Sequence, residues 1–328
     1  MKLLNDVTET IGNTPMVKLS RLTKAFDVEG NIFAKLEYLN PGFSKKDRVA
    51  LQMIVEAEEA GLLTPGQAVV ELTSGNTGTG LAIVCACKGY RFIACMSKGN
   101  SVERARMMKA LGAEVVLVDQ MSGSIKGQVS GDDLALVEER TKQIVEELNA
   151  FRADQFNLEA CNHAHEYYTG EEMWDQTDGK IDVFVDFIGS GSTFSGCSKT
   201  LKKHNPLIRC YVVEPASAAI YAGKEITDKG HKVQGGGYCI DLPLVDKALI
   251  DGYVQITNDE ARDTARKLAE LEGIFAGFSS GANVYAALKL LSGTEKGKNI
   301  VVTLNDSGLK YLSTDLFQEI ECSMGPNN

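Results

Sequence analysis

The sequence predicts an α/β fold in which mostly parallel sheets are covered by helices on both faces. Runs typical of strands alternate with runs typical of helices along most of the chain, which is the pattern of βαβ units. Several strand runs are continuously apolar, as expected for strands buried on both faces of a sheet. With 328 residues, of which 44% are hydrophobic and 24% charged, the chain is long enough to form two domains.

The first predicted elements lie between residues 7 and 20, which favour a short helix, a turn and a strand. Gly12-Asn13 tolerates the left-handed backbone of such a turn, and Pro15 fixes its exit. Further strands are predicted at 31–37, 67–72, 91–96, 114–118, 183–188, 209–214, 253–256 and 299–304. Helices are predicted at 49–61, 77–89, 102–111, 134–149 and 282–292.

A domain boundary is predicted near residues 150–156, after the long charged helix at 134–149. We expect the first segment of the chain to pack on the later domain, because the strand–helix alternation starts again after that segment. The prediction is a smaller N-terminal domain of residues 36–155 and a larger domain formed by residues 1–35 and 156–328, with a ligand in the cleft between them.

Composition argues against several classes of function. The net charge of −10 is unfavourable for a nucleic-acid-binding protein and gives no reason to expect an anionic membrane surface as a partner. No apolar run is long enough to span a membrane, and the N-terminus lacks the pattern of a secretory signal. Cytoplasmic residence is therefore expected.

The eight cysteines are scattered, mostly in apolar or strand-like stretches. This distribution favours free thiols in a reducing compartment over disulfides. Cys161, His163 and His165 form a local group of metal-binding residue types. A thiol and two imidazoles on one short segment are weak grounds for a metal site, and no metal is expected.

Residues 40–48 connect a strand run to a helix run and carry Lys46 at the mouth of the predicted helix. A lysine amine can form a Schiff base with a carbonyl once its pKa is lowered by neighbouring cations or by a dry pocket. Lys45, Arg48 and the positive helix start would all lower the pKa of Lys46. The alternative interpretation is a solvated basic turn.

A polar loop follows the strand at 67–72. Thr73, Ser74, Asn76 and Thr77 offer hydroxyl and amide groups beside exposed backbone N–H groups at a helix start. Such a turn binds a carboxylate or another anion. The alternative is a helix cap with glycines for a tight turn, but three glycines with four polar residues exceed what a cap needs.

The loop Gly189-Ser190-Gly191-Ser192-Thr193 follows the apolar strand at 183–188 and resembles a phosphate cradle at a helix start. Phe194 stands where a nicotinamide-cofactor fingerprint needs its third glycine, and no Gly-Lys-Ser/Thr follows as in a nucleotide-triphosphate loop. Alone, the loop indicates an unspecified phosphate. Polar turns at 277–281 and 305–308 also follow strands or open helices, so all of these loops could meet at one sheet edge.

A phosphate loop combined with a Schiff-base lysine implies pyridoxal phosphate (PLP). The chain resembles the cysteine synthase family of PLP enzymes, of the tryptophan-synthase-β-like fold (fold type II), over nearly its whole length. The resemblance lies in residues 11–15 (Ile-Gly-Asn-Thr-Pro), 35–42 (Lys-Leu-Glu-Tyr-Leu-Asn-Pro-Gly), 73–78 (Thr-Ser-Gly-Asn-Thr-Gly) and 311–314 (Tyr-Leu-Ser-Thr). It implies two twisted, mostly parallel sheets with PLP between them, and a homodimer.

The resemblance also implies roles for single residues. Lys46 is expected to form the Schiff base and then to remove the substrate's α-proton, and Asn76 to contact the ring hydroxyl. Ser279 is expected to face the pyridine nitrogen, where a hydroxyl makes the ring a weaker electron sink than a carboxylate would. Residues 189–193 would hold the phosphate. The substrate carboxylate would be bound by Thr73, Ser74, Thr77 and Gln155.

The chain departs from the family pattern in three places. The phosphate loop reads Gly-Ser-Gly-Ser-Thr in place of Gly-Thr-Gly-Gly-Thr, and Phe187 stands near a usual glycine. The segment 234–241 brings Gly236, Tyr238 and Asp241 near the expected substrate side chain, although a turn with an exposed acid is the alternative. Residues 97–100 (Ser-Lys-Gly-Asn) replace the usual Pro-Glu-Thr, which puts a serine acetyltransferase partner in doubt.

The function implied by the resemblance is β-replacement on a serine or cysteine derivative through an aminoacrylate intermediate, with O-acetylserine and sulfide giving cysteine and acetate. The alternative is β-elimination or β-replacement on cysteine that releases hydrogen sulfide, including cystathionine or lanthionine formation. A catalytically silent sensor of the same fold is a further alternative, and the presence of Lys46, Asn76 and Ser279 argues against it. A full cystathionine β-synthase architecture is not expected.

Overall fold

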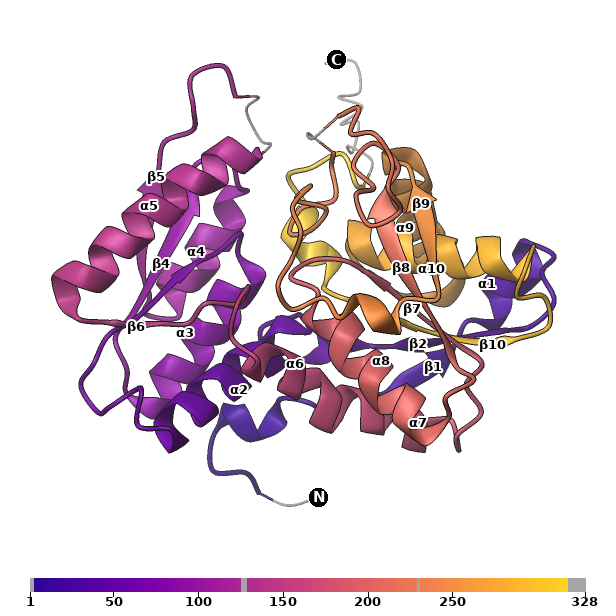
Figure 1. Ribbon diagram of the computed structural model, residues 1–328, viewed down its shortest axis with the longest axis horizontal. Helices are drawn as coiled ribbons and strands as arrows, with labels where there is room; N and C mark the ends of the chain where they lie inside the picture. Colours follow the sequence, from indigo (N-terminus) through magenta and orange to yellow (C-terminus); the bar gives the residue numbers. More distant parts are fainter. Residues whose placement is uncertain (1–2, 125–128, 229–230, 318–328) are drawn as a thin grey trace, which may run out of the picture.

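The computed structural model describes residues 3–124, 129–228 and 231–317. These residues form two separate sheets, each flanked by helices (Figure 1). The six-stranded sheet has the order β1-β2-β10-β7-β8-β9, and the four-stranded sheet has the order β5-β4-β3-β6. All pairs of neighbouring strands are parallel except β1 and β2. The predicted α/β fold with two mostly parallel sheets is confirmed.

The six-stranded sheet combines strands from both ends of the chain. Its strands are β1 (Met16–Lys18), β2 (Asn31–Lys35), β7 (Val183–Phe187), β8 (Arg209–Pro215), β9 (Gly252–Ile256) and β10 (Asn299–Thr303). Side chains on alternate positions of β7 enter different cores, as the twofold period of a strand requires. Val183, Val185 and Phe187 pack with α9 (Asn258–Glu272) and α10 (Phe278–Leu291). Phe184 packs with α8 (Ser192–His204) on the other face.

The four-stranded sheet is built from one continuous part of the chain. Its strands are β3 (Val69–Leu72), β4 (Phe92–Ser97), β5 (Glu114–Val118) and β6 (Phe151–Arg152). Val69 faces a core with α2 (Lys46–Glu59) and α3 (Asn76–Lys88), whereas Val70 faces α5 (Gly131–Leu148). A further helix, α4 (Val102–Ala110), packs against α3.

The remaining elements are short. They are η1 (Val7–Thr10), α1 (Ser20–Ala25), η2 (Glu37–Leu39), α6 (Ala160–Ala164), the π-helical turn η3 (His165–Thr169), α7 (Gly170–Gln176), η4 (Lys247–Leu249) and η5 (Gly308–Tyr311). Within the described residues, no helix is both long and apolar enough to cross a membrane. The division into domains at residues 36–155 stays a prediction, and the membership of the two sheets supports it.

Candidate active site

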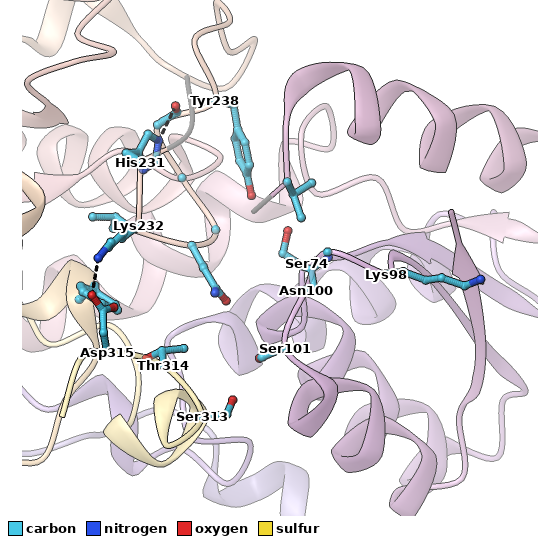
Figure 2. Close-up of a pocket in the computed structure, with 18 of the residues that line it drawn as sticks. Ser74, Lys98, Asn100, Ser101, His231, Lys232, Tyr238, Ser313, Thr314 and Asp315 are labelled. Atoms are coloured by element: carbon cyan, nitrogen blue, oxygen red, sulfur yellow. Dashed lines mark hydrogen bonds and ion pairs between the residues drawn. The ribbon is translucent and has the colours of Figure 1, made fainter. Parts of the chain in front are cut away.

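Two adjoining cavities contain most of the predicted site residues. The smaller cavity has a volume of about 40 Å³ and the larger one about 500 Å³, and residues 234 and 235 line both. The predicted residues on the smaller cavity are Lys46, Asn76, Gly189, Ser190, Gly191, Thr193 and Ser279. The predicted residues on the larger cavity are Ser74, Gly236 and Tyr238 (Figure 2). The structure therefore brings together loops that follow strands of both sheets.

Lys46 is the first residue of α2 and is buried. Its Nζ donates a hydrogen bond to Ser190 Oγ at 2.9 Å, which joins the lysine to the glycine-rich loop. Burial and the neighbouring Lys45 ammonium lower the pKa of Lys46 to about 8. Lys45 itself is paired with the buried Asp186 at 2.9 Å. The lowered pKa favours the unprotonated amine, which is the form that a Schiff-base nucleophile requires.

The glycine-rich loop has a shape that suits a phosphate group. Gly191 has a φ of +90°, and a Cβ at this position would collide with the Val245 side chain. A Cβ on Gly189 would lie 3.0 Å from the carbonyl oxygen of Gly235. The loop opens α8, whose N-terminal backbone N–H groups and dipole favour an anion. Small residues, buried hydroxyls and a helix start together fit the phosphate of PLP.

The hydroxyl groups of Ser190, Ser192 and Thr193 in the glycine-rich loop all have close polar neighbours. The Oγ atoms of Ser190 and Ser192 lie 3.1 Å apart, although Ser192 does not line the cavity wall. Thr193 Oγ1 lies 3.1 Å from Nε2 of the buried His165. Burial holds the pKa of His165 well below its usual range, so this imidazole is neutral.

Ser279 and Ser280 stand side by side at the start of α10 but face different surroundings. Ser279 lines the small cavity. Ser280 is fully buried, and its Oγ accepts the backbone N–H of Asn305 at 2.9 Å. Of these two hydroxyl groups, the structure therefore leaves that of Ser279 facing the small cavity, and its place at the pyridine ring stays a prediction.

Asn76 has two partners that sequence reasoning missed. Its Nδ2 donates to Asp306 Oδ2 at 2.9 Å, and its Oδ1 accepts from Lys310 Nζ at 2.7 Å. Both partners are buried. The signal that could have found them is their position, because they lie in the polar turn after the last strand and next to the Tyr-Leu-Ser-Thr block.

The substrate loop is held by bonds within the protein. Thr73 Oγ1 accepts the backbone N–H groups of Gly75 and Gly78 at 3.0 and 2.9 Å, as in the capping alternative. Thr77 Oγ1 donates to Gln155 Oε1 at 2.5 Å. These three predicted carboxylate binders, Thr73, Thr77 and Gln155, are buried and line neither cavity. Ser74 is the member of the loop that faces the larger cavity.

Gln155 is itself fixed by Glu71, a second feature that the sequence did not reveal. Gln155 Nε2 donates to Glu71 Oε1 at 3.1 Å, and Arg152 Nε donates to Glu71 Oε2 at 2.9 Å. Burial raises the pKa of Glu71 to about 8. The loop that follows β3 is therefore tied to β6 through a buried carboxyl group.

Tyr238 and Asp241 are in contrasting places. The phenol of Tyr238 points toward Ser74 across the larger cavity (Figure 2), and burial raises the pKa of Tyr238. Its ring meets Phe156 edge-on with 5.7 Å between ring centroids. Asp241 is exposed, is paired with Lys247 at 2.7 Å and lines neither cavity.

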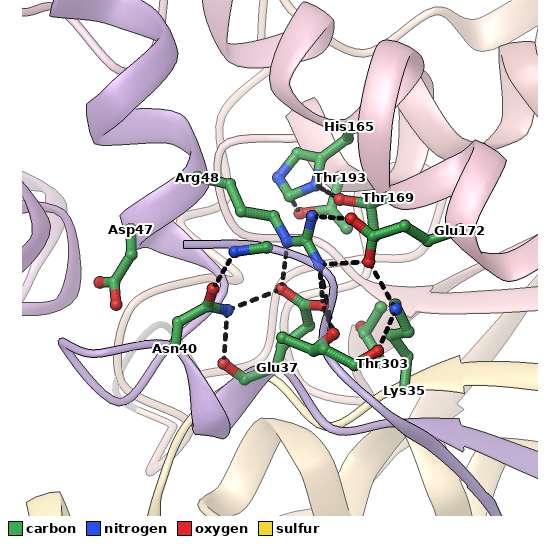
Figure 3. A network of polar contacts seen from close by, with 12 residues as sticks. Lys35, Glu37, Asn40, Asp47, Arg48, His165, Thr169, Glu172, Thr193 and Thr303 are labelled. Atoms are coloured by element: carbon green, nitrogen blue, oxygen red, sulfur yellow. Dashed lines mark hydrogen bonds and ion pairs between the residues drawn. The ribbon is translucent and has the colours of Figure 1, made fainter. Parts of the chain in front are cut away.

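A separate group of charges lies beneath the start of α2 (Figure 3). Arg48 donates to Glu37 at 2.8 and 2.9 Å and to Glu172 at 2.6 and 2.7 Å. Lys35 reaches the same Glu172 at 2.6 Å. This network anchors the helix turn that carries Lys46 to β2 and α7.

Within the described residues, the cysteines and the group of Cys161, His163 and His165 are not arranged as a metal site. No group of three His, Cys, Asp or Glu side chains there could hold a metal ion. Cys161 and His165 are buried, and His163 Nδ1 lies 2.8 Å from Glu56. Among the described residues, Cys85, Cys87, Cys95, Cys161, Cys197 and Cys210 are free thiols, and Cys322 lies outside the described residues.

Comparison with known proteins identifies the family of the chain. The family model described as pyridoxal-phosphate dependent enzyme matches residues 7–306. A cysteine synthase from Staphylococcus aureus is 40% identical over 320 residues, which are 96% of this chain and 98% of that protein.

Two solved structures resemble the fold closely. An O-acetyl serine sulfhydrylase isoform from Entamoeba histolytica has a TM-score of 0.88 and 35% identity, covering 98% of this chain and 93% of that one. A hydrogen sulfide-producing enzyme from Fusobacterium nucleatum has a TM-score of 0.85 and 39% identity, covering 94% of this chain and 100% of that one. The chain therefore belongs to the cysteine synthase family of PLP-dependent enzymes.

Proposed function

We propose that this enzyme catalyses β-replacement on a serine derivative, with O-acetylserine and sulfide giving cysteine and acetate. The observation that carries the proposal is the Lys46 amine, which is buried, has a lowered pKa and lies in contact with the glycine-rich loop at the start of α8. The similarity to a cysteine synthase and an O-acetyl serine sulfhydrylase supports this choice of substrates.

Most of the residues that would hold PLP line the small cavity, and Ser192 belongs to the same loop. Residues 189–193 would bind the phosphate, Ser279 the pyridine nitrogen and Asn76 the ring hydroxyl. When bound, PLP withdraws electrons from the substrate's α-carbon and so weakens the bond to the α-proton. Lys46 would be the base that takes this proton, because burial and the Lys45 ammonium lower the pKa of its amine.

The protein's remaining contribution is to bind the amino acid and to exclude water. Ser74 faces the larger cavity and would bind the substrate carboxylate there. Thr73, Thr77 and Gln155 would join it through a rearrangement of the loop, because their polar groups are bonded inside the protein. Closure of this loop over the substrate would protect the reacting β-carbon from water.

A second candidate is the release of hydrogen sulfide from cysteine. It is favoured by the half-buried phenol of Tyr238 opposite Ser74, which could donate a proton to a leaving sulfur, and by the likeness to a hydrogen sulfide-producing enzyme. Asp241 remains a predicted substrate residue whose carboxylate is paired with Lys247 on the surface. We further propose a cytoplasmic homodimer, with a serine acetyltransferase partner in doubt.

One experiment tests the site and the reaction together. The purified protein with PLP is reduced with borohydride, digested and analysed by mass spectrometry, and the PLP mass is expected on the peptide that contains Lys46. Cysteine formation from O-acetylserine and sulfide is then measured beside sulfide release from cysteine. A cofactor attached to another lysine would refute the site, and faster sulfide release than cysteine formation would favour the second candidate.

A further inference from the structure

Asn76 lies between a cation and a carboxylate. Lys310 Nζ donates to its Oδ1 at 2.7 Å, and its Nδ2 donates to Asp306 Oδ2 at 2.9 Å. Lys310 and Asp306 are 2% and 1% exposed, so water competes little for these bonds. The contacts join the start of α3 to the turn that follows β10, and therefore to the six-stranded sheet.

The chemistry of the two partners allows only one orientation of the amide. An ammonium group can only donate hydrogen bonds, and an ionised carboxylate can only accept them. Rotating the amide by 180° would place Nδ2 against Lys310 and Oδ1 against Asp306, and both bonds would be lost. In the observed orientation Nδ2 has a second hydrogen, on a side chain that lines the small cavity together with Lys46 and Ser279.

Both partners are held from other sides as well. Lys310 Nζ also donates to the carbonyl oxygen of Gly42 at 2.8 Å. Tyr311 Oη donates to Asp306 Oδ2 at 2.8 Å. A Cβ on Gly277 would collide with the Asp306 carboxylate and with the Tyr311 ring, so this close approach requires glycine. The two groups that orient Asn76 are thus fixed in place before any ligand binds.

We propose that Lys310 and Asp306 are positioning residues that keep Asn76 as a hydrogen-bond donor toward the ring hydroxyl of PLP. This inference rests on the proposed function, because it uses the predicted contact between Asn76 and that hydroxyl. Tight cofactor binding then depends also on Lys310 and Asp306, two residues that do not line the small cavity. Their effect acts through the orientation of one amide.

The test measures PLP affinity rather than turnover alone. The dissociation constant of PLP is determined by equilibrium dialysis of the apoenzyme, and the absorbance spectrum of the bound cofactor is recorded. Lys310→Met should weaken PLP binding about tenfold, as expected for the loss of one well-formed hydrogen bond, and should shift the absorbance band. Lys310→Arg keeps a donor and should stay within about threefold of the unaltered protein.

Three further variants separate positioning from a general structural effect. Lys199→Met makes the same substitution at an exposed lysine and should leave PLP binding unchanged. Asn76→Ala should weaken binding at least as much as Lys310→Met. The double variant should bind PLP no more weakly than Asn76→Ala alone, because Lys310 has nothing left to orient. Asp306→Asn places beside Asn76 an amide that can donate as well as accept a hydrogen bond, so this variant should weaken PLP binding severalfold. It replaces Lys310→Met as the test if the Lys310→Met protein does not fold.

The outcomes distinguish the inference from the function on which it rests. If Asn76→Ala weakens PLP binding but Lys310→Met and Asp306→Asn leave affinity and spectrum unchanged, the positioning role is wrong and the function stands. Additive losses in the double variant would also overturn the positioning role. If the unaltered protein binds no PLP, the proposed function itself fails.

Discussion

Two buried polar clusters meet at neighbouring residues of α2, and they differ in how completely their charges are paired. The scaffold cluster consists of Arg48, Glu37, Glu172 and Lys35, in which Arg48 binds both carboxylates with two hydrogen bonds each. The site cluster consists of Asp47, Asp306, Lys310 and Asn76. Within the described part of the chain, Oδ1 of Asp47 and Oδ1 of Asp306 are buried and have no hydrogen-bond partner.

The pKa values of the carboxyl groups shift in opposite directions in the two clusters, whereas burial lowers the pKa of both lysines, Lys35 and Lys310. Although burial alone would raise it, the hydrogen bonds and charge of Arg48 lower the pKa of Glu172 to about 2. In the site cluster burial dominates, so the pKa of Asp47 is raised and that of Lys310 is lowered. Pairing with Arg48 keeps the scaffold carboxylates charged, whereas the incompletely paired Asp47 has a pKa of about 7, a shift of the kind found at functional sites.

The largest effect is expected for Lys46, which directly precedes Asp47 and Arg48 in α2. Lys46→Ala should lower turnover by roughly 10³-fold or more, because it removes both the Schiff-base amine and the base for the α-proton. Circular dichroism should show an unchanged fold. The matched control is Lys199→Ala on the surface, which should retain full activity. Full turnover by the Lys46 variant would refute its role.

Breaking the scaffold cluster should cost stability. Arg48→Met leaves the buried Glu37 and the partly buried Glu172 without their main partner, so the free energy of unfolding measured in urea should fall by about 3–5 kcal/mol. The control is Arg91→Ala, which breaks an exposed pair with Glu114 and should cost less than about 1 kcal/mol. Equal losses in the two variants would show that burial of the network does not matter.

Acid should weaken the scaffold cluster in a defined range of pH. The folded-state pKa of Glu172 lies below its ordinary value of 4.5, at about 2. Its contribution to stability is therefore complete above pH 4.5 and is lost as the pH falls toward 2, up to roughly 3 kcal/mol. Urea titrations between pH 6 and pH 3 should show this slope, and Glu172→Gln should flatten it. An unchanged slope in the variant would assign the acid sensitivity elsewhere.

The smallest effect on stability is expected in the site cluster. Asp47→Asn should change the free energy of unfolding by less than about 1 kcal/mol, because burial already favours the neutral form of Asp47 and an amide oxygen can still accept the Gly42 N–H. Thermal or urea unfolding of the apoenzyme measures this. A loss as large as that of Arg48→Met would remove the distinction between the clusters.

Most of the fold could be predicted because local patterns determine it. The strand predicted at 114–118 has the observed bounds, and the one predicted at 183–188 ends one residue later than β7. The two-residue strand β6 was missed, since Phe151 and Arg152 are too few to form an alternating pattern. Its pairing with β3 depends on a neighbour that lies about 80 residues earlier in the chain.

Site residues that lie in a local loop motif could be predicted, whereas site residues that depend on contacts between distant parts of the sequence could not. Lys46, Ser279 and the loop at 189–193 were identified from their motifs, and the structure places them on one cavity apart from Ser192. Lys310 reaches Asn76 across 234 positions of sequence, and no local pattern records such a contact. The motif also could not show that the Thr73 hydroxyl accepts two backbone N–H groups of its own loop and so caps it.

The place of β10 in the sheet order bears on how newly made chains mature. β10 pairs with both β2 and β7, yet it is the last strand of the described chain to leave the ribosome. The four-stranded sheet can assemble once residue 152 has emerged, whereas the centre of the six-stranded sheet must wait for residue 303. Binding of the vitamin B6 derivative in the proposed site would thus be a step that follows translation of β10.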